Sequence, residues 1–505
     1  MVEVVDFSLR YPAAGDWAVR GASLSVRDGE FVVLCGDSGS GKTTLLRSLV
    51  RAVAPVGETR GYIKIDGARI SDIQPKQYAQ TVGFLSQSAE NQIVADKVWH
   101  ELAFGMESLG FPTAKIRARA AETAAYFGIT DWYDRETGTL SGGQKQILCL
   151  ASVMTLAPKI LILDEPLSQL DPVCVDRYLD MLAKLNRDKG ITIIMAEHNL
   201  EAVWSLGCRF VLMAGGSLSG DISPYMDSLP AVPRLARTLG LPSDSPAAFR
   251  QAFLRRYAVR PREDAPENGK AYLSVKGLFF RYGRENGMAL RDINLSFSKK
   301  TTSLVGANGS GKSTLLSCLA GRKLREGKIK TERRIAMLPQ DVQTIFTEKT
   351  VWADLENAAL RGCAGDIGQV VERLGIRDYL GAHPFDLSGG EQQLIAFAKI
   401  LLLEADVILL DEPTKGMSER FKNRIREEIS RSDKRFIISS HDLEFCARAS
   451  QEMIMLFRGE VIAQGPPHEI LLDNRYYTTP LARLLGGECG GNLLYEEVLA
   501  SCEEK

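Results

Sequence analysis

Short runs of consecutive apolar residues recur along this chain, and each run leads directly into a glycine-rich turn or into charged side chains. The runs 31–35 and 302–305 lead into glycines, whereas the runs 160–163 and 407–410 end in paired carboxylates. Runs of about four to eight apolar residues bounded in this way indicate strands of a central parallel sheet buried on both faces. Because helix-like segments follow the turns, the pattern predicts an α/β fold.

The same order of segments is present twice, and 505 residues are too many for one hydrophobic core. We therefore predict a first domain at 1–230 and a second at 271–505. The prolines and charges of 231–270 indicate a helical extension of the first domain followed by an exposed linker. The glycines of 485–505 indicate a loosely attached tail.

A glycine-rich turn follows the first central strand in each half. The turn and the start of the next helix comprise Gly36, Asp37, Ser38, Gly39, Ser40, Gly41, Lys42, Thr43 and Thr44, and again Gly306, Ala307, Asn308, Gly309, Ser310, Gly311, Lys312, Ser313 and Thr314. A strand, a glycine-rich turn and a helix start form a phosphate cradle, in which backbone N–H groups and a lysine surround the phosphates. A hydroxyl at the helix start can bind magnesium. The sequence therefore predicts two nucleotide sites.

Aromatic residues precede both turns. Tyr11 and Tyr282 lie 25 and 24 positions before the first glycine, which suits a face for stacking on adenine. A tyrosine that merely packs at a strand end is the alternative for either residue. A third apolar strand ends in His198 in one half and His441 in the other; a lone histidine there is more often structural, but the repetition favours a function.

Composition excludes several classes of protein. The 62 lysine and arginine residues balance 63 aspartate and glutamate residues, which leaves no overall basic charge for nucleic acid or acidic lipid. The nine cysteines are scattered singly, without CxxC pairs, which indicates reduced thiols and neither a disulfide framework nor a zinc site. No signal pattern is evident, and no apolar run reaches the ~18 to 20 residues that span a bilayer. Action on a membrane would need a partner.

Together, these motifs resemble the nucleotide-binding subunits of ABC transporters, in two copies that cover nearly the whole chain. The signature segments that complete the resemblance are Ser141, Gly142 and Gly143 in the first half and Ser388, Gly389 and Gly390 in the second. The resemblance implies that each domain carries an antiparallel β-subdomain and a helical insertion. It also implies that the domains pair head to tail, with one ATP between Lys42 and Ser388 and another between Lys312 and Ser141.

The resemblance further assigns chemical roles. Mg²⁺ would be held by Asp164 with Thr43 and by Asp411 with Ser313. The strand-end glutamates, Glu165 and Glu412, would orient water. Gln87 and Gln340 would sense Mg²⁺ and the γ-phosphate, and the switch histidines, His198 and His441, would hold that phosphate. Both halves keep these residues, so we predict ATP hydrolysis at two sites. Ser418 stands where the family usually has an acid, which predicts that the Lys42 site is the weaker one.

Spacing indicates where the halves differ. Gly36 and Gln87 are 51 positions apart, whereas Gly306 and Gln340 are 34 apart. We therefore expect the second half to lack a strand pair resembling 61–67.

Segments 84–94 and 98–105 look like the ATPases of energy-coupling factor transporters. Such importers take up vitamins or metal ions through a polytopic membrane scaffold and a separate substrate-binding membrane subunit. The resemblance implies these partners, a position at the cytoplasmic face of the membrane, and no nucleic acid. Acids that could receive arginines of the scaffold are Glu90, Asp96, Glu101, Asp341 and Glu348. A solvated helix face is the alternative for each acid.

Three other functions stay open at this point: a tandem sugar-importer ATPase, a soluble tandem ATPase acting on ribosomes or nucleic acid, and a scaffold that does not hydrolyse ATP. The intact second phosphate loop argues against the first, the neutral charge against the second, and the intact glutamates against the third.

Overall fold

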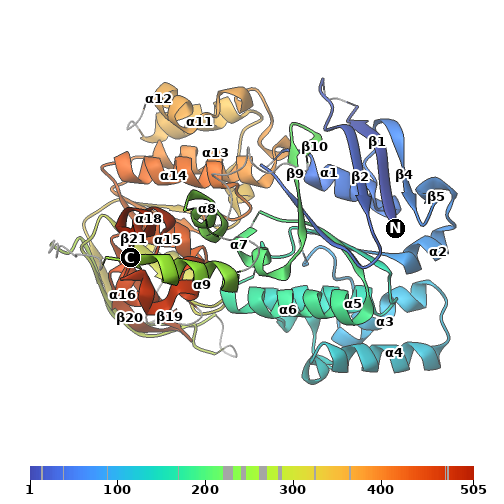
Figure 1. Cartoon of the computed structure of the whole chain (residues 1–505). Coiled ribbons are helices and arrows are strands. Elements are labelled where there is room, and N and C mark those ends of the chain that lie inside the picture. Colours follow the sequence, from blue (N-terminus) through green and yellow to red (C-terminus); the bar gives the residue numbers. More distant parts are fainter. Residues whose placement is uncertain are drawn as a thin grey trace. The chain divides into compact units, whose positions relative to one another are not determined.

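The chain forms two compact units, 1–229 and 230–505, which are described separately (Figure 1). The computed structural model describes residues 1–12, 15–37, 39–87, 89–168, 170–198, 200–219, 231–239, 241, 246–260, 270–282, 287–322, 326–362, 366–472, 474 and 477–504. Within these ranges, no helix is both long enough and apolar enough to cross a membrane.

A six-stranded sheet is the centre of the first unit, in the order β10-β9-β3-β8-β7-β6. Its strands are β3 (Phe31–Cys35), β6 (Val82–Leu85), β7 (Ile160–Asp164), β8 (Thr192–Ala196), β9 (Arg209–Ala214) and β10 (Ser217–Ser219). Every residue of β3, β7 and β8 is buried, and these strands pair in parallel. The fully apolar runs therefore form central parallel strands, as the sequence predicts.

An antiparallel sheet lies beside this core, in the order β2-β1-β4-β5. The strands are β1 (Val2–Arg10), β2 (Val19–Val26), β4 (Glu58–Ile65) and β5 (Ala68–Arg69). Buried and exposed positions alternate along β2, because only one face of the sheet packs on the core. That face shares a cluster of apolar side chains with α1 (Lys42–Ser48).

Helices complete the first unit: α2 (Pro75–Thr81), α3 (Val98–Ser108), α4 (Thr113–Tyr126), α5 (Gly142–Met154), α6 (Pro172–Lys189) and α7 (Leu200–Val203). Helices α3 and α4 lie against α5 as a helical subdomain (Figure 1). The predicted helical insertion is therefore present.

The second unit repeats this plan. Its central sheet has the order β16-β17-β18-β14-β19-β20, and its antiparallel sheet has the order β13-β12-β15. The strands are β12 (Leu273–Phe280), β13 (Leu290–Phe297), β14 (Thr301–Val305), β15 (Glu326–Thr331), β16 (Ile335–Leu338), β17 (Val407–Asp411), β18 (Arg435–Ser439), β19 (Glu452–Phe457) and β20 (Glu460–Gly465). The helices are α10 (Lys312–Leu319), α11 (Val351–Gly362), α12 (Ile367–Leu374), α13 (Gly389–Leu401), α14 (Glu419–Arg431) and α15 (Leu443–Ala449).

The expectation that the second half lacks a strand pair resembling 61–67 is correct only in part: among the described residues β5 has no equivalent, whereas β4 has one in β15. Strand β15 pairs antiparallel with β12 as β4 pairs with β1. Each of these strands contains a left-handed glycine that lies against the neighbouring backbone: a Cβ at Gly61 would be 2.3 Å from the carbonyl oxygen of Asp6, and one at Gly327 would be 2.5 Å from that of Gly277. Among the described residues, the shorter spacing removes the equivalents of β5 and α2.

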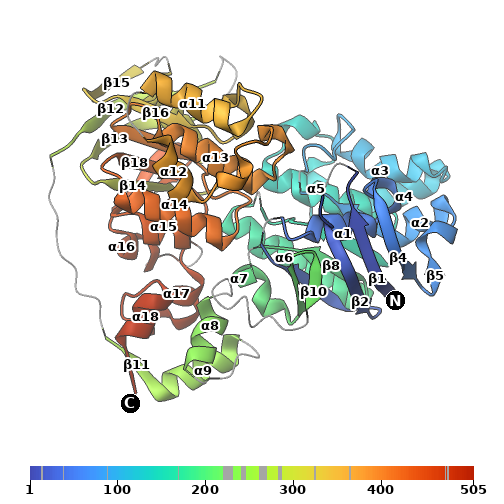
Figure 2. The same cartoon turned by 90° about the horizontal axis from the view of Figure 1, so that it is seen from above.

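A C-terminal subdomain of the second unit combines residues from two distant parts of the chain. One part supplies α8 (Ala231–Thr238), α9 (Pro246–Arg256) and β11 (Tyr257–Val259). The other part supplies α16 (Pro467–Leu472), α17 (Pro480–Leu485), α18 (Tyr495–Ser501) and β21 (Cys502–Glu504). Strands β11 and β21 pair antiparallel, and α8, α9, α17 and α18 lie together (Figure 2).

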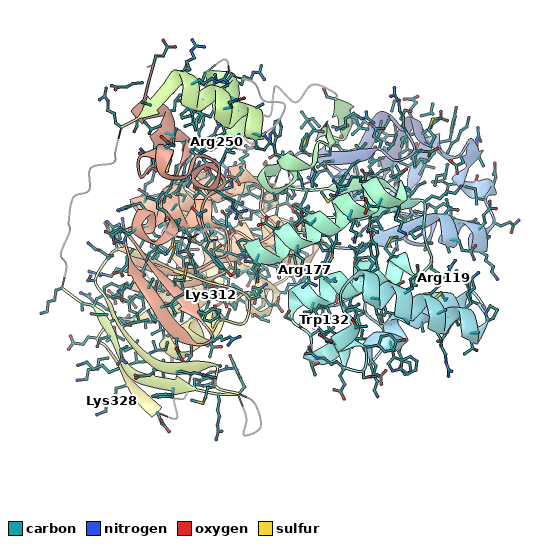
Figure 3. All side chains as sticks on the ribbon, turned by 60° about the horizontal axis from the view of Figure 1, so that its bottom comes forward. Arg119, Trp132, Arg177, Arg250, Lys312 and Lys328 are labelled. Atoms are coloured by element: carbon teal, nitrogen blue, oxygen red, sulfur yellow. The ribbon has the colours of Figure 1, made fainter. Side chains whose placement is uncertain are left out.

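Two expectations from sequence are therefore corrected. The helical segment after residue 230 packs in the second unit and does not extend the first, and the described part of the tail is packed in the same cluster. Phe253 and Val498 are both fully buried in that cluster. The Arg250 side chain, on the surface of α9, donates from Nε to the carbonyl oxygen of Leu484 at 2.8 Å (Figure 3).

Replacing Phe253 by alanine tests this assignment. The Phe253 ring lies 5.6 Å from the rings of both Phe249 and Tyr257, so the substitution leaves a cavity in the C-terminal subdomain. We expect the free energy of unfolding of the second unit to fall by about 3 to 5 kcal/mol. Hydrogen exchange followed by mass spectrometry should show faster exchange in α17 and β19 and unchanged exchange in β3 and β7.

The buried Phe127 of the first unit provides the matched control. Phe127→Ala should accelerate exchange in the first unit and leave the second unchanged. Faster exchange of β3 and β7 in Phe253→Ala would show that the helices belong to the first unit.

Candidate nucleotide sites

In both phosphate loops, several glycines lie so close to a neighbouring backbone that a side chain would not fit. A Cβ at Gly36 would lie 2.1 Å from the carbonyl oxygen of Met213, and one at Gly41 would lie 2.3 Å from that of Ala18. The corresponding distance for Gly306 is 2.2 Å, to the carbonyl oxygen of Leu456. The φ angles of Gly36, Gly41 and Gly306 also lie at positive values that side chains disfavour. Ser38 lies outside the described residues.

A buried lysine is folded into each loop. The Nζ of Lys42 donates to the carbonyl oxygens of Gly36 and Asp37, both at 2.8 Å, and Lys312 makes the same two contacts in its own loop. Lys42 is 4% exposed, and this burial lowers its pKa, although Glu165 opposes the shift. Phosphate oxygens at this place would accept from the lysine more strongly than the neutral carbonyls do. The cradle therefore fits a nucleotide phosphate.

A hydroxyl and a carboxylate stand together at the end of each loop. Thr43 Oγ1 donates to Asp164 Oδ1 at 2.8 Å, and Ser313 Oγ donates to Asp411 Oδ1 at 2.9 Å. Burial, with a smaller contribution from the neighbouring glutamate, raises the pKa of both aspartates. Hard oxygen ligands of this kind suit Mg²⁺, and a divalent cation would offset the unfavourable burial of the carboxylate. The residues present thus fit the metal.

In the first unit, a glutamine and a histidine hold the strand-end glutamate. Gln87 Nε2 donates to Glu165 Oε2 at 2.8 Å, and His198 Nε2 lies 3.0 Å from Glu165 Oε1. Burial acts to raise the pKa of Glu165, but the contacts with His198 and Lys42 outweigh burial and leave the pKa below its ordinary value. An ionised carboxylate held in this way can orient and polarise a water molecule.

The second unit holds its glutamate differently. His441 Nδ1 lies 2.8 Å from Glu412 Oε2, so the opposite ring nitrogen makes this contact. Burial acts to lower the pKa of His441, but the negative charge of Glu412 outweighs it and raises the pKa. Gln340 is exposed, and in the described part of the unit no hydrogen bond joins it to Glu412. The structure thus brings Gln87 to its glutamate but not Gln340.

Both strand-end glutamates adopt left-handed backbone angles, with φ of 49° at Glu165 and 52° at Glu412. Residues other than glycine rarely adopt this conformation, and backbone strain of this kind tends to cluster at functional sites. The sequence pattern gave no sign of this strain.

The predicted adenine platforms lie beside the phosphate loops. The hydroxyl of Tyr11 is 3.2 Å from Thr44 Oγ1, and that of Tyr282 is 3.1 Å from Thr314 Oγ1. Both tyrosines are about two-fifths exposed, at 38% and 43%. Each ring is therefore fixed next to the first helical turn while part of its surface stays open.

The two signature segments begin helices. Ser141 caps α5 by accepting from the N–H of Gln144, while its own N–H donates to Gln144 Oε1. Ser388 occupies the same place on α13, where its N–H and hydroxyl both donate to Glu391 Oε2. The serine of each signature segment thus has a local structural role, since it bonds to the residue three positions later at a helix N-terminus.

Comparison with known proteins shows the family. A family model described as ABC transporter matches residues 19–168 and 290–415, which include both phosphate loops and both strand-end glutamates. The chain belongs to the ABC transporter family of ATPases. Members of this family bind ATP with Mg²⁺ and hydrolyse it.

Individual proteins that are similar to this chain support the same family assignment. A protein of Bacillus thuringiensis subsp. konkukian that carries the name of an ABC transporter ATP-binding protein is 34% identical, over 99% of this chain and 98% of its own length. A Streptomyces avermitilis protein of the same name is 32% identical, over 96% and 97%. The crystal structure of the archaeal ribosome recycling factor aABCE1 with the stalk protein aP1 has a TM-score of 0.63 over 92% of this chain and 90% of that chain, at 21% identity. This last likeness shows the fold alone.

One acid predicted to face a membrane partner of this ABC ATPase is instead internal. Glu101 is 4% exposed, and its Oε2 accepts from the N–H groups of Val94 and Ala95, both at 3.0 Å. The prediction for Glu101 is therefore wrong, because a glutamate at this place serves to hold the preceding loop. The other acids have partners within the chain: Lys145 for Glu90, His100 for Asp96, the N–H of Gln343 for Asp341, and Asn357 for Glu348.

Polar groups next to both switch histidines, one buried and two partly buried, are not among the residues predicted from the sequence. Glu197 is 2% exposed directly before His198, and Lys422 forms an ion pair with Asp442 directly after His441. A charged residue at the end of an otherwise apolar strand was the available signal for Glu197. The Lys422–Asp442 pair joins residues far apart in sequence and left no local signal.

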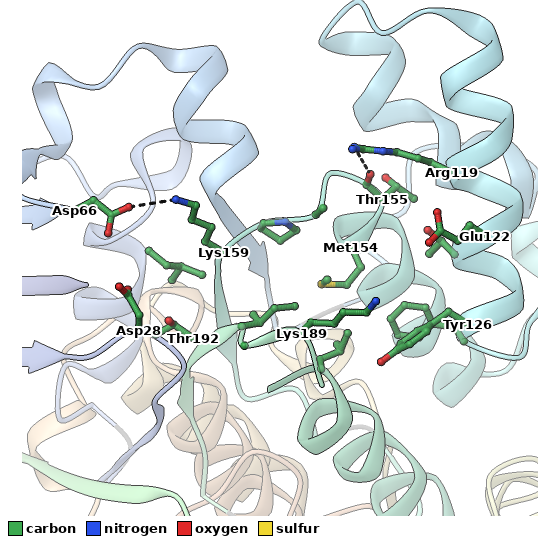
Figure 4. A pocket seen from close by; sticks show the side chains of 18 residues that line it. Asp28, Asp66, Arg119, Glu122, Tyr126, Met154, Thr155, Lys159, Lys189 and Thr192 are labelled. Atoms are coloured by element: carbon green, nitrogen blue, oxygen red, sulfur yellow. Dashed lines mark hydrogen bonds and ion pairs between the residues drawn. The ribbon is translucent and has the colours of Figure 1, made fainter. Parts of the chain in front are cut away.

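A separate cavity of about 620 Å³ lies in the first unit, between α4 and the starts of β7 and β8 (Figure 4). Its lining includes Arg119, Tyr126 and Lys189, but none of the predicted nucleotide-site residues. The cavity thus takes no part in the nucleotide site of that unit.

The raised pKa of His441 predicts a pH dependence of stability. The ion pair of His441 with Glu412 stabilises the second unit below the unfolded-state pKa of 6.5, and this contribution is lost as pH rises through the raised folded-state pKa. We expect the nucleotide-free unfolding free energy of this unit to fall as pH rises above 6.5. Urea denaturation across this range measures the fall.

His441→Gln should abolish that fall, since glutamine does not titrate. The pKa of Glu412 is lowered from its ordinary value of 4.5, so the stability that Glu412 contributes is lost only as pH falls below 4.5, outside this range. An unchanged pH slope in His441→Gln would contradict the prediction.

Proposed function

We propose that this chain is the ATP-hydrolysing subunit of an ABC importer of the energy-coupling factor type. The observation that carries the proposal is the same polar set in both units: a lysine inside a glycine loop, a hydroxyl on an aspartate, and a histidine on a strand-end glutamate. Both units thus have the groups that phosphoryl transfer to water requires.

Hydrolysis would depend on positioning and on electrostatic stabilisation. Lys42 and Lys312 would bind the phosphates, and Thr43 with Asp164, or Ser313 with Asp411, would hold Mg²⁺. Magnesium neutralises charge that develops on the phosphate oxygens. Glu165 and Glu412 would orient the attacking water, and His198 and His441 would hold the γ-phosphate. Gln87 and Gln340 would respond to its presence.

Two ATP molecules would lie between the units. The phosphate loop of Lys42 would face the signature segment of Ser388, and the loop of Lys312 would face that of Ser141. The N-termini of α5 and α13 would suit the phosphates, because a helix N-terminus favours negative charge. Binding of ATP would close the units, and hydrolysis would open them.

The helical subdomains would transmit this motion to membrane partners. Large apolar side chains are exposed there, with Phe104 on α3 at 49%, Trp352 on α11 at 43% and Leu360 on α11 at 77%. Exposed apolar groups of this size suit a protein contact. The partners would be a polytopic scaffold and a substrate-binding membrane subunit for a vitamin or metal ion, with this chain at the cytoplasmic face.

Isolation of the complex tests the importer. The tagged chain is purified from gently solubilised native membranes, and the proteins bound to it are identified by mass spectrometry. A polytopic scaffold with a small membrane protein supports the proposal. Recovery only with ribosomes or nucleic acid from the soluble fraction would overturn it in favour of the soluble ATPase.

Removing the strand-end carboxylates should abolish most hydrolysis. Glu165→Gln combined with Glu412→Gln is expected to slow phosphate release by roughly 10² to 10⁴ while ATP still binds, because an amide cannot act as a base for water. Binding of a fluorescent ATP analogue and release of phosphate are measured together. The exposed Glu122 supplies the control Glu122→Gln, which should change neither. Unchanged turnover in the double variant would exclude these roles.

The two sites should contribute unequally. Asp171 caps α6 by accepting from the N–H of Cys174 at 2.9 Å, whereas Ser418 begins α14 without a hydrogen bond from its side chain to the helix. Because we assign Ser418 to the Lys42 site, we expect Lys312→Ala to remove more of the total ATPase activity than Lys42→Ala. Equal losses would contradict this asymmetry.

A further inference from the structure

One buried carboxyl group in the first unit joins the switch histidine to the segment that follows the strand-end glutamate. Glu197 Oε2 accepts from the N–H of His198 at 2.7 Å, and its Oε1 accepts from the N–H of Leu167 at 3.0 Å. Leu167 lies two positions after Glu165. Glu197 therefore connects the ends of β8 and β7 at the place where His198 meets Glu165.

The burial of Glu197 explains why both of its carboxylate oxygens bind backbone N–H groups. Glu197 is 2% exposed, and a carboxylate is buried only where donors compensate for the lost water. Two backbone N–H groups bound by both oxygens supply that compensation and hold the main chain at two points. Because the ring of His198 follows directly from one of these points, its distance to Glu165 depends on Glu197.

The second unit lacks this glutamate and makes the connection with other groups. Ser440 stands before His441, and its Oγ lies 3.4 Å from Thr414 Oγ1. After His441, Asp442 Oδ2 accepts from Lys422 Nζ at 2.7 Å, and Asp442 Oδ1 accepts from the N–H of Phe445. Lys422 lies on α14, which begins in the segment after Glu412.

The ion pair is particular to the second unit. Aligning Asp171 with Ser418 places Val175 opposite Lys422, and aligning the switch histidines places Asn199 opposite Asp442. Neither residue carries a charge. Among the described residues, the charged connection is Glu197 in the first unit and the Lys422–Asp442 pair in the second, and the two differ in residue type and in position along the chain.

We propose that Glu197 and the Lys422–Asp442 pair are positioning groups for ATP hydrolysis, each fixing its switch histidine relative to the strand-end glutamate. This inference rests on the proposed function of the two histidines. It also implies that each switch histidine can be displaced without displacing the other, since the two connections share no residue.

Signals of the histidine rings test the positioning without any turnover. The chain has five histidines, so a sample labelled at histidine Cε1 gives few NMR signals, each assignable by single substitution. Glu197→Gln should shift or split the His198 signal and leave that of His441 unchanged, because an amide nitrogen cannot accept from a backbone N–H. Lys422→Met should do the reverse.

Matched controls separate this effect from a general loss of stability. Glu101 also binds two backbone N–H groups through a buried carboxyl group, and Lys399, like Lys422, forms an ion pair with an aspartate of its own unit, Asp354. Glu101→Gln and Lys399→Met should leave the His198 and His441 signals unchanged. If Glu197→Gln does not fold, Glu197→Asp serves instead, because the shorter side chain cannot reach both N–H groups. An unchanged His198 signal, or an equal change in the controls, would overturn the inference.

Turnover gives the second test. Glu197→Gln should lower hydrolysis at the first-unit site by roughly 10- to 100-fold, the cost of misplacing a reacting group by a fraction of an ångström to one ångström. The same substitution in a His198→Ala chain should add nothing, because its effect passes through that histidine. An equal loss in both backgrounds would overturn the positioning role. If the unaltered chain does not hydrolyse ATP, the proposed function is overturned. The NMR signals of His198 and His441 then test the positioning by themselves.

Discussion

The parallel register of the central strands determines where the polar groups of each site lie. In the first unit Leu34 pairs with Ala196, and Ala196 pairs with Asp164, so β3, β8 and β7 end at one edge. The chain leaves this edge as the phosphate loop, as Glu197 with His198, and as Glu165. Because strand pairing fixes these exits within a few ångströms, three segments far apart in sequence form one site.

Burial at this edge explains why the polar groups come in pairs. A charged group without a partner is costly in a poorly solvated place, and each one here has a partner within the same unit. Lys42 binds carbonyl oxygens of its own loop, Asp164 accepts from Thr43, and Glu165 meets His198. These partners hold the site in shape, and a nucleotide with magnesium could replace several of them without leaving a charge uncompensated.

The two units satisfy the same constraint with different residues. His198 presents Nε2 to its glutamate, whereas His441 presents Nδ1. Gln87 contacts Glu165, whereas Gln340 is exposed. The strand-end glutamates of the two units therefore have different hydrogen-bonding surroundings.

The α/β fold and the tandem repeat could be predicted from sequence, as could many residues that the structure brings together at the candidate sites, because these features depend on local order. Buried strands require unbroken apolar runs such as 160–163, and a phosphate loop requires glycines where no side chain fits. Which distant segments meet is evident only from the packing of the folded chain. This packing places Phe253 with Val498 in the C-terminal subdomain, buries Glu101 under its own loop, and joins Lys422 to Asp442. Such contacts depend on how whole elements pack, and a single apolar or charged residue does not specify its partner.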